Sequence, residues 1–316
     1  MNIAIWGAGG IGCYYGARLQ KSGHQITYIA RGEHLSALCK KGLVIHHEDL
    51  SFNGSVTAVS QEQLVADYSC NDFDLIIITL KSTATEALLS QYGHWLAAGQ
   101  CYVLSLQNGV RNEKLIAEAV GEGRTLGGLA IRIGGHIIAP GVVEAKGPAQ
   151  VVFGEWPSVI DRAARSAQVT ELYEVLNQAG IPTTLSDDIR KELWRKLLIN
   201  NGVNPLSAMT GLDTKQLTHH PLYGDIVYKM MEETAIAAKD EGVEITTDDV
   251  DEMYRLIREF DAIKTSMLVD KEKGRPLELS AICDPVIHGA KAQGQRALFT
   301  ELVNEVLTSD DTIKSL

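Results

Sequence analysis

A run of small residues near the start of the chain has the spacing of a phosphate-binding turn. It reads Gly7-Ala8-Gly9-Gly10-Ile11-Gly12, and it lies between an apolar stretch, Ile3–Trp6, and a helical segment that closes at Ser22-Gly23. In a strand–turn–helix unit the first glycine permits the tight turn, the second lets the backbone approach a pyrophosphate, and the third lets the helix pack closely on the sheet. The N–H groups at the helix start then hold the diphosphate. The Gly7–Gly12 loop therefore predicts a dinucleotide site.

The end of the second predicted strand, Ile26–Ile29, indicates which nicotinamide cofactor binds. A carboxylate at this point bonds the ribose 2′-hydroxyl of NAD, whereas an arginine accepts the 2′-phosphate of NADP. Arg31 occupies this place, and its guanidinium can form paired charge-assisted hydrogen bonds with phosphate. Glu33 is the alternative, since it serves NAD if the turn is shaped differently. We predict NADP(H).

Two more strand ends carry polar side chains. The third strand ends Thr79-Leu80-Lys81-Ser82, and the fourth ends Leu106-Gln107-Asn108-Gly109. Ligands of open α/β sheets collect at the carboxyl ends of the strands, so Lys81 and Asn108 are predicted to line the nicotinamide end of the cofactor site. A solvated lysine and an ordinary Asn-Gly turn are the alternatives.

A polar stripe interrupts an apolar helix that is predicted over residues 189–208. Lys196, Asn200 and Asn204 follow one another at intervals of four, which leaves about 40° between successive members on one helix face. An ammonium group above two carboxamides suits a polar substrate, and solvated helix residues are the alternative. Pro205 is predicted to end or kink the helix beside Asn204.

The elements that position these residues divide the chain in two. From residue 2 to about 185, short β-branched runs alternate with amphipathic helical stretches, which is typical of a parallel sheet in an α/β domain. Residues 127–154 resemble hairpin strands with a turn at Pro140-Gly141, and Ile181–Leu185 is predicted as the last strand. We assign residues 1–187 to a Rossmann-type domain that binds NADP.

After Asp188, a plausible helix N-cap, helical periodicity replaces strand signals. We assign residues 188–316 to an all-helical substrate and catalytic domain. Its predicted helices span residues 189–208, 221–241, 248–260, 262–272, 277–293 and 299–308.

Three local patterns in this half receive structural interpretations. His219-His220-Pro221 is typical of a helix start and a poor metal site. The acidic run at residues 247–252 complements a helix N-terminus. Met267 and Leu268 are expected in the core.

Composition excludes several classes of protein. The chain has 316 residues, 45% of them apolar and 22% charged, and a net charge of −11, which disfavours nucleic acid as a partner. Apolar runs such as Leu75–Ile78 are far shorter than the ~20 residues of a membrane span, and no secretory signal opens the sequence. The five scattered cysteines predict reduced thiols rather than a disulfide framework or a zinc site. We expect a cytoplasmic protein without a metal, and the oligomeric state is left open between a monomer and a homodimer.

The motifs together resemble the ketopantoate reductase (2-dehydropantoate 2-reductase) family. The resemblance rests on the Gly7–Gly12 loop, Thr79-Leu-Lys81, Asn108-Gly109, Glu192-Leu-Trp-Arg-Lys196-Leu-x-x-Asn200-x-x-x-Asn204-Pro-Leu, and Ser266-Met267-Leu-x-Asp270 followed by Gly274-Arg-Pro-x-Glu278. These motifs run in order along nearly the whole chain. The spacing within the Lys196 helix and the Ser266 to Glu278 spacing are specific, whereas the glycine loop is shared with many dehydrogenases.

The resemblance implies an NADPH-dependent reduction of 2-dehydropantoate to (R)-pantoate, a step towards pantothenate and coenzyme A. It implies that Lys196 donates the proton and that Glu278 is its partner carboxylate. It also implies that Arg31 contacts the 2′-phosphate. The implied substrate-binding residues are Asn108, Asn200, Asn204 and Ser266, and Lys81 lines the junction with the cofactor.

The chain departs from the family pattern near its substrate residues. Ile263 stands where many members have an asparagine, and Cys283-Asp284-Pro285 replaces the usual continuation after Glu278 towards a glycine. A proline-rich stretch before the last helix is also missing. Two alternatives follow: a reductase of another 2-oxo acid, and a catalytically silent NADP-binding sensor.

Overall fold

The computed structural model describes residues 1–158 and 166–314, which fall into two compact units. The first unit comprises Met1–Gln107 and Asn112–Ile189, and the second comprises Asn108–Arg111 and Arg190–Leu316. The predicted division at 187/188 took no account of Asn108–Arg111, which packs with the second unit.

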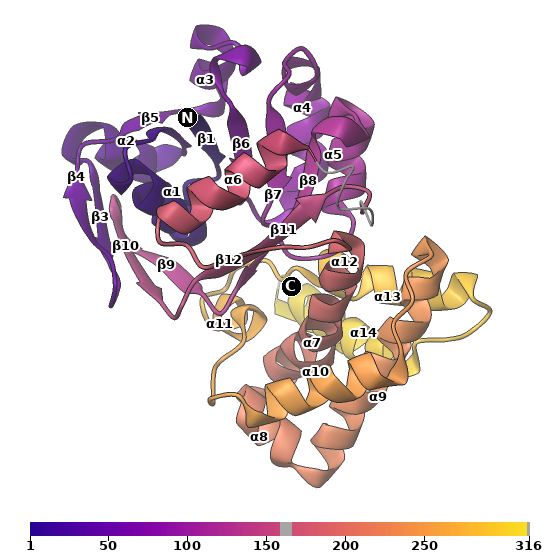
Figure 1. Ribbon diagram of the computed structural model, residues 1–316. Helices are drawn as coiled ribbons and strands as arrows, with labels where there is room; N and C mark the ends of the chain where they lie inside the picture. Colours follow the sequence, from indigo (N-terminus) through magenta and orange to yellow (C-terminus); the bar gives the residue numbers. More distant parts are fainter. Residues whose placement is uncertain (159–165, 315–316) are drawn as a thin grey trace. The chain divides into compact units, whose positions relative to one another are not determined.

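An eight-stranded sheet forms the centre of the first unit (Figure 1). Neighbouring strands are parallel except for β8 and β11, which are antiparallel, so the predicted α/β sheet is confirmed. The strand order is β12 (Thr183–Leu185), β11 (Gln150–Glu155), β8 (Thr125–Ile131), β7 (Tyr102–Ser105), β6 (Leu75–Ile78), β1 (Asn2–Trp6), β2 (Gln25–Ile29) and β5 (Thr57–Val59).

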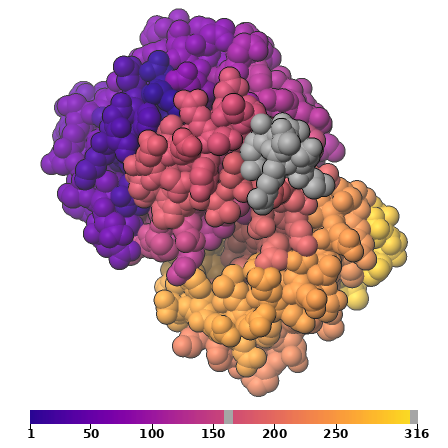
Figure 2. Space-filling view, viewed as in Figure 1, coloured from indigo at the N-terminus to yellow at the C-terminus, as the bar shows by residue number. Residues whose placement is uncertain are grey.

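Both faces of this sheet are buried, as its continuous apolar strands require. In β1, Ile3 and Ile5 face one core, which includes side chains of α1 (Gly10–Lys21), α2 (Gly32–Lys41) and α6 (Ala167–Gln178). Ala4 and Trp6 face the other core, with α3 (Gln61–Asp67), α4 (Thr85–Ala97) and α5 (Asn112–Val120). The helix α6 lies in front of the sheet in Figure 1 and forms part of the pink surface in Figure 2.

A second, four-stranded sheet packs on α1. Its order is β4 (Ser51–Gly54), β3 (Leu43–His46), β10 (Val142–Lys146) and β9 (Gly134–Ala139). The predicted hairpin is confirmed, because β9 and β10 pair through a turn in which Gly141 has a φ of +81°. The strands β3 and β4 were not predicted, since the exposed and half-buried residues of β4 show no strong apolar alternation.

The described part of the second unit contains helices joined by loops, and no strands. Its helices are α7 (Ile189–Thr210, whose first residue belongs to the first unit), α8 (Thr214–His219), α9 (Pro221–Ala238), α10 (Thr247–Glu259), α11 (Ser266–Glu272), α12 (Leu279–Ile282), α13 (Asp284–Ala292) and α14 (Leu298–Lys314). None of the helices in the described residues combines the length and the apolarity needed to cross a bilayer. The predicted helix start is confirmed at His220, whose side chain accepts from backbone N–H groups at the start of α9, whereas His219 is the last residue of α8.

Three helix predictions were wrong in detail. The helix α7 continues through Pro205 to Thr210, so Pro205 does not end it, and the kink that the sequence also allowed stays a prediction. The predicted helix at 262–272 begins only at Ser266, because the backbone N–H and C=O of Ile263 pair with Thr214. The predicted helix at 277–293 is two helices, and Pro285 lies in the first turn of α13, where its missing N–H costs no hydrogen bond.

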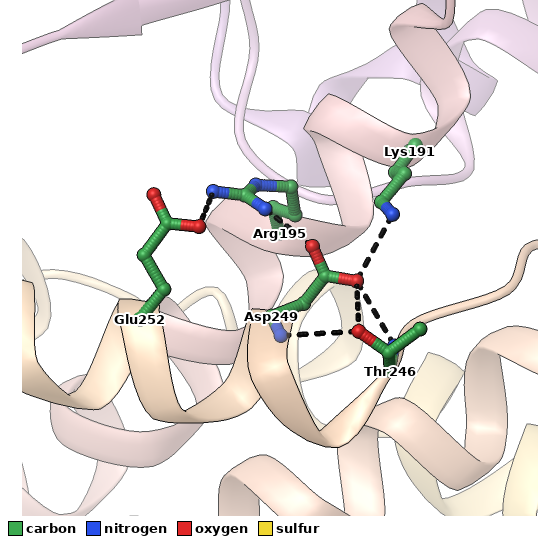
Figure 3. Close-up of polar contacts among 5 residues, drawn as sticks. All are labelled: Lys191, Arg195, Thr246, Asp249 and Glu252. Atoms are coloured by element: carbon green, nitrogen blue, oxygen red, sulfur yellow. Dashed lines mark hydrogen bonds and ion pairs between the residues drawn. The ribbon is translucent and has the colours of Figure 1, made fainter.

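An ion-pair network attaches α7 to α10 within the second unit (Figure 3). Lys191 Nζ lies 3.0 Å from Asp249 Oδ2, and the Arg195 guanidinium contacts the other oxygen of that carboxylate and lies 2.8 Å from Glu252 Oε2. The backbone N–H and the hydroxyl of Thr246 each donate to Asp249 at 2.9 Å. The acidic run therefore begins a helix, as predicted, and it also fixes the first turns of α7.

The network makes the stability of the second unit depend on pH. Burial raises the pKa of Asp249, but the hydrogen bonds from Thr246 and Lys191 outweigh burial and lower the pKa to about 2. Because this value lies below the ordinary ~3.9, the stabilisation is complete above about pH 4 and is lost as the pH falls through about 2.

Replacing Asp249 with asparagine keeps its shape but removes the charge that Lys191 and Arg195 face. We expect the free energy of unfolding at neutral pH to fall by about 2 kcal/mol, and the difference from the unsubstituted protein to shrink between about pH 4 and pH 2. Urea unfolding at several pH values measures both. The control is Asp248→Asn, since Asp248 is exposed on the same helix. Equal effects of the two substitutions would contradict the role of Asp249.

Candidate active site

The Gly7–Gly12 loop joins β1 to α1 through contacts that only glycine permits. Gly7 has a φ of +116°, and a Cβ there would lie 2.7 Å from Leu80 N. A Cβ on Gly12 would lie 2.4 Å from Gly7 O and 2.5 Å from Thr79 Oγ1. The Thr79 hydroxyl donates to Gly7 O at 2.7 Å and ties the turn to the end of β6. The loop is therefore held by backbone contact on both sides.

The same loop leaves space where a dinucleotide would lie. A Cβ on Gly9 would have Gly7 O, 3.9 Å away, as its only neighbour within 4 Å. The N–H of Cys13 makes the first helical bond, to Gly9 O, so the N–H groups of Gly10, Ile11 and Gly12 have no acceptor within the helix. Open space beside N–H donors at a helix start fits a diphosphate, and Ala8, buried beside them, completes the turn through its N–H bond to Ile29 O.

Packing against the small sheet requires a glycine at position 10, which the local sequence did not indicate. A Cβ there would lie 2.1 Å from the carbonyl carbon of Gly135 in β9. The side chain of His34, in α2, links the same parts of the unit, because Gly141 N–H donates to His34 Nδ1 at 3.1 Å and Cys13 Sγ lies 3.7 Å from its Nε2. The strand β9 of the small sheet therefore leaves no room for a side chain at Gly10.

The cations predicted to contact the cofactor lie on exposed positions of the first unit. Arg31 is the N-cap residue of α2. Gly32, which has a positive φ, follows it, and Glu33 lies in the first helical turn. Arg31 and Glu33 are both exposed, so either can reach a ribose substituent. Lys81 is exposed, lies three residues after the end of β6, and precedes the short 3-10 helix Ser82–Ala84.

The structure confirms the polar stripe as a geometric feature of α7. The helix is continuous from Ile189 to Thr210, so Lys196, Asn200 and Asn204 share a face, while the apolar stripe is almost completely buried. Lys196 and Asn200 are half-buried, and Asn204 is 7% exposed. A neighbouring residue, Asn201, was missed: its side-chain nitrogen donates to two threonine hydroxyls, at 3.0 and 2.9 Å, and holds α7 to α9 and α14.

The remaining predicted site residues of the second unit lie in or beside the helices α11 and α12. Glu278 directly precedes α12 and is only 7% exposed, and a carboxylate buried to this extent requires a polar or cationic partner. Gly109 has a φ of +93°, and a Cβ there would lie 2.9 Å from Ala281 O, so Asn108-Gly109 packs against α12. Ser266 is the exposed first residue of α11. The core positions predicted beside it, Met267 and Leu268, are buried.

Among the described side chains, no group of three or more histidines, cysteines, aspartates or glutamates is placed to hold a metal ion. The donors of the two units are instead backbone N–H groups, carboxamides, hydroxyls and cations. Such donors suit an anionic organic ligand.

Alanine substitutions in the loop should separate folding from cofactor binding. Gly9→Ala has space in the fold, so we expect unchanged thermal unfolding but affinity for NADPH reduced about tenfold or more, because the methyl group meets the pyrophosphate. Gly12→Ala collides with backbone, so we expect about 1–3 kcal/mol of destabilisation.

Calorimetric titration with NADPH and thermal melting measure the two effects. Gly123→Ala, which meets nothing within 4 Å, is the control and should change neither. Unchanged NADPH affinity in the folded Gly9→Ala protein would contradict the placement of the cofactor.

Comparisons with known proteins agree with the motifs. The family described as "Ketopantoate reductase PanE/ApbA" matches residues 3–158, and its C-terminal counterpart, "Ketopantoate reductase PanE/ApbA C terminal", matches residues 188–309. A 2-dehydropantoate 2-reductase of Mesorhizobium japonicum is 32% identical over 305 residues, which are 90% of each chain.

Solved structures share the whole architecture. A 2-dehydropantoate 2-reductase from Geobacter metallireducens superposes with a TM-score of 0.84 at 27% identity and covers 98% of this chain and 100% of its own. A D-mandelate dehydrogenase in a ternary structure with NADH and anilino(oxo)acetate superposes with a TM-score of 0.88 at 23% identity, with full coverage of both chains, and shows the same fold. This chain belongs to the ketopantoate reductase family of oxidoreductases.

Proposed function

We propose that this chain reduces 2-dehydropantoate (ketopantoate) to (R)-pantoate with NADPH, in the biosynthesis of pantothenate and coenzyme A. The observation that carries the proposal is the stripe of Lys196, Asn200 and Asn204 on one continuous face of α7, in a chain whose relatives include 2-dehydropantoate 2-reductases. A protein that only binds a dinucleotide needs the glycine loop but has no need of a proton donor.

The first unit would hold the cofactor. The free N–H groups of the Gly7–Gly12 loop would bind the diphosphate, and Arg31 would pair with the 2′-phosphate. Lys81, which follows β6, would contact its nicotinamide end. When bound, NADPH supplies the hydride that reduces the ketone carbon.

Lys196 is assigned as the general acid. Reduction of a ketone leaves negative charge on the carbonyl oxygen, and an ammonium group at hydrogen-bond distance stabilises that charge and protonates the oxygen. We assign Glu278 as the carboxylate that keeps Lys196 protonated and oriented, a role that suits a carboxylate at 7% exposure.

The other polar residues assigned to the site would bind the substrate. Asn108, Asn200 and Asn204 supply carboxamides and Ser266 supplies a hydroxyl, and each of these groups donates hydrogen bonds to carboxylate or hydroxyl oxygens. A net charge of −11 makes such local donors necessary, because the protein as a whole repels an anionic substrate.

One observation favours a different 2-oxo acid. Ile263, 44% exposed, offers an apolar side chain where many family members have an asparagine, and its own backbone is held by Thr214. An apolar side chain in that place suits a less polar substrate. A D-mandelate dehydrogenase has the same fold.

Loss of NADPH absorbance with ketopantoate and with a panel of aliphatic and aromatic 2-oxo acids tests the function. Turnover that is fastest with ketopantoate supports the proposal. Faster turnover with another acid assigns that acid, and tight NADPH binding without turnover of any acid would identify a sensor.

The same assay tests Lys196. We expect Lys196→Ala to lower kcat by about 10²- to 10⁴-fold, the contribution of general acid catalysis, with little change in the Kd for NADPH. Lys215→Ala, an exposed lysine of α8, is the control. Comparable turnover by Lys196→Ala would refute the assignment.

The cofactor preference depends on Arg31. We expect Arg31→Ala to raise the KM for NADPH about 10- to 100-fold, the loss of hydrogen bonds to a charged group, while the KM for NADH stays the same. Glu33→Ala is the comparison variant, because its side chain is equally exposed on the same helix. If Glu33→Ala weakens NADH and Arg31→Ala has no effect on NADPH, the cofactor is NAD.

A further inference from the structure

Two thiols of the first unit are in contact at the end of the large sheet where the central strands β6 and β7 begin. Cys70 Sγ is 3.4 Å from Cys101 Sγ. Cys101 directly precedes β7, and Cys70 begins a single 3-10 turn shortly before β6. Because β6 and β7 are adjacent parallel strands, the topology brings these two positions together although 31 residues separate them. The pair is 2% and 7% exposed.

The surroundings of the pair favour a thiolate at Cys70. The pKa of Cys70 is lowered, first by the hydrogen bond from the Cys101 thiol and also by the charge of Arg124. The Arg124 guanidinium donates to Cys101 O at 3.0 Å and to Leu96 O at 2.9 Å, which keeps it beside the pair. Gly99 leaves room for the sulfur, since a Cβ there would lie 2.4 Å from Cys70 Sγ.

The other three cysteines lack this arrangement. Burial raises the pKa of Cys13 and of Cys283, which suits inert core thiols. Cys39 is exposed, and its thiol contacts the Ala58 carbonyl. All five are free thiols, as the sequence predicts.

We propose that Cys70 and Cys101 form a two-electron redox site that hydrogen peroxide converts into an intramolecular disulfide. The Cys70 thiolate attacks one peroxide oxygen and becomes a sulfenic acid, and the other oxygen leaves as water after protonation. The Cys101 sulfur then attacks the Cys70 sulfur, its proton leaves with the sulfenic hydroxyl as a second water, and the S–S bond forms. Two thiols are oxidised and one peroxide is reduced to two waters.

The disulfide would form away from the cofactor residues. Cys70 and Cys101 lie where β6 and β7 begin, whereas Lys81 and the Thr79 contact to the glycine loop lie where β6 ends. A cross-link between these segments restrains the unfolded chain, so the oxidised protein should melt at a higher temperature than the reduced protein.

Peptide mapping of the Cys39→Ser protein after brief treatment with hydrogen peroxide tests the proposal directly. The substitution removes the exposed thiol that would link two molecules. Trypsin separates the pair, because residues 42–81 contain Cys70 as their only cysteine and residues 82–111 contain only Cys101. We expect these two peptides to be joined, to separate on addition of dithiothreitol, and to be accompanied by loss of two alkylatable thiols in denaturant.

Single substitutions test the order of the steps. Cys101→Ser should trap the sulfenic acid on Cys70 as a dimedone adduct, whereas Cys70→Ser should leave Cys101 as a thiol. The proposal would be overturned if Cys70 and Cys101 both remain alkylatable after treatment with peroxide. It would also be overturned if the two thiols are converted only to sulfinic acids and the two peptides are not joined. The result with Cys39→Ser decides the question even if the single variants fail to fold.

Discussion

The first unit depends on backbone-to-backbone contact at the start of α1. At Gly12 the helix lies so close to the turn and to the end of β6 that there is no room for a Cβ. At Gly10 the helix lies equally close to β9. Larger residues would push α1 away from the sheet and tilt the axis along which its N–H groups point. The proposed dinucleotide site would thus be a consequence of tight packing, because side chains are excluded at Gly7 and Gly12 while the space beside Gly9 is open.

The helix α7 has a comparable double role in the second unit. Its buried apolar stripe and Asn201 fasten it to other helices, and the Asp249 network holds its first turns, so that the face carrying Lys196 is presented by a rigid support. A proton donor must stay within hydrogen-bond reach of the reacting oxygen, and small displacements cost large factors in rate. The charges of Lys191 and Arg195 contribute to this support through their ion pairs with Asp249 and Glu252, although Arg195 is next to Lys196 in sequence.

Much of this arrangement could be predicted from local pattern. The strands of the parallel sheet, the glycine turn, the hairpin at Gly141 and the polar spacing in α7 depend on residues close together in the chain, and each appears near its expected position. What failed depended on distant partners. The hydrogen bonds of Ile263 with Thr214 make α11 begin only at Ser266, and the ion pairs of Asp249 with Lys191 and Arg195 fix α7 to α10. The roles of Gly10 and His34 also required knowledge of β9 and its turn, which pack against α1 from more than 90 residues away.

We propose that this chain reduces the C2 ketone of a 2-oxo acid with hydride from a nicotinamide cofactor. The most direct measurement uses NADPH that carries deuterium at both C4 positions, followed by mass spectrometry of the product formed from ketopantoate. The account predicts a 2-hydroxy acid with one deuterium at C2, formed by the unsubstituted protein and much more slowly by Lys196→Ala. The proposed reaction would be contradicted if the protein folds and binds NADPH but leaves ketopantoate unchanged. A product without deuterium at C2 would also contradict it.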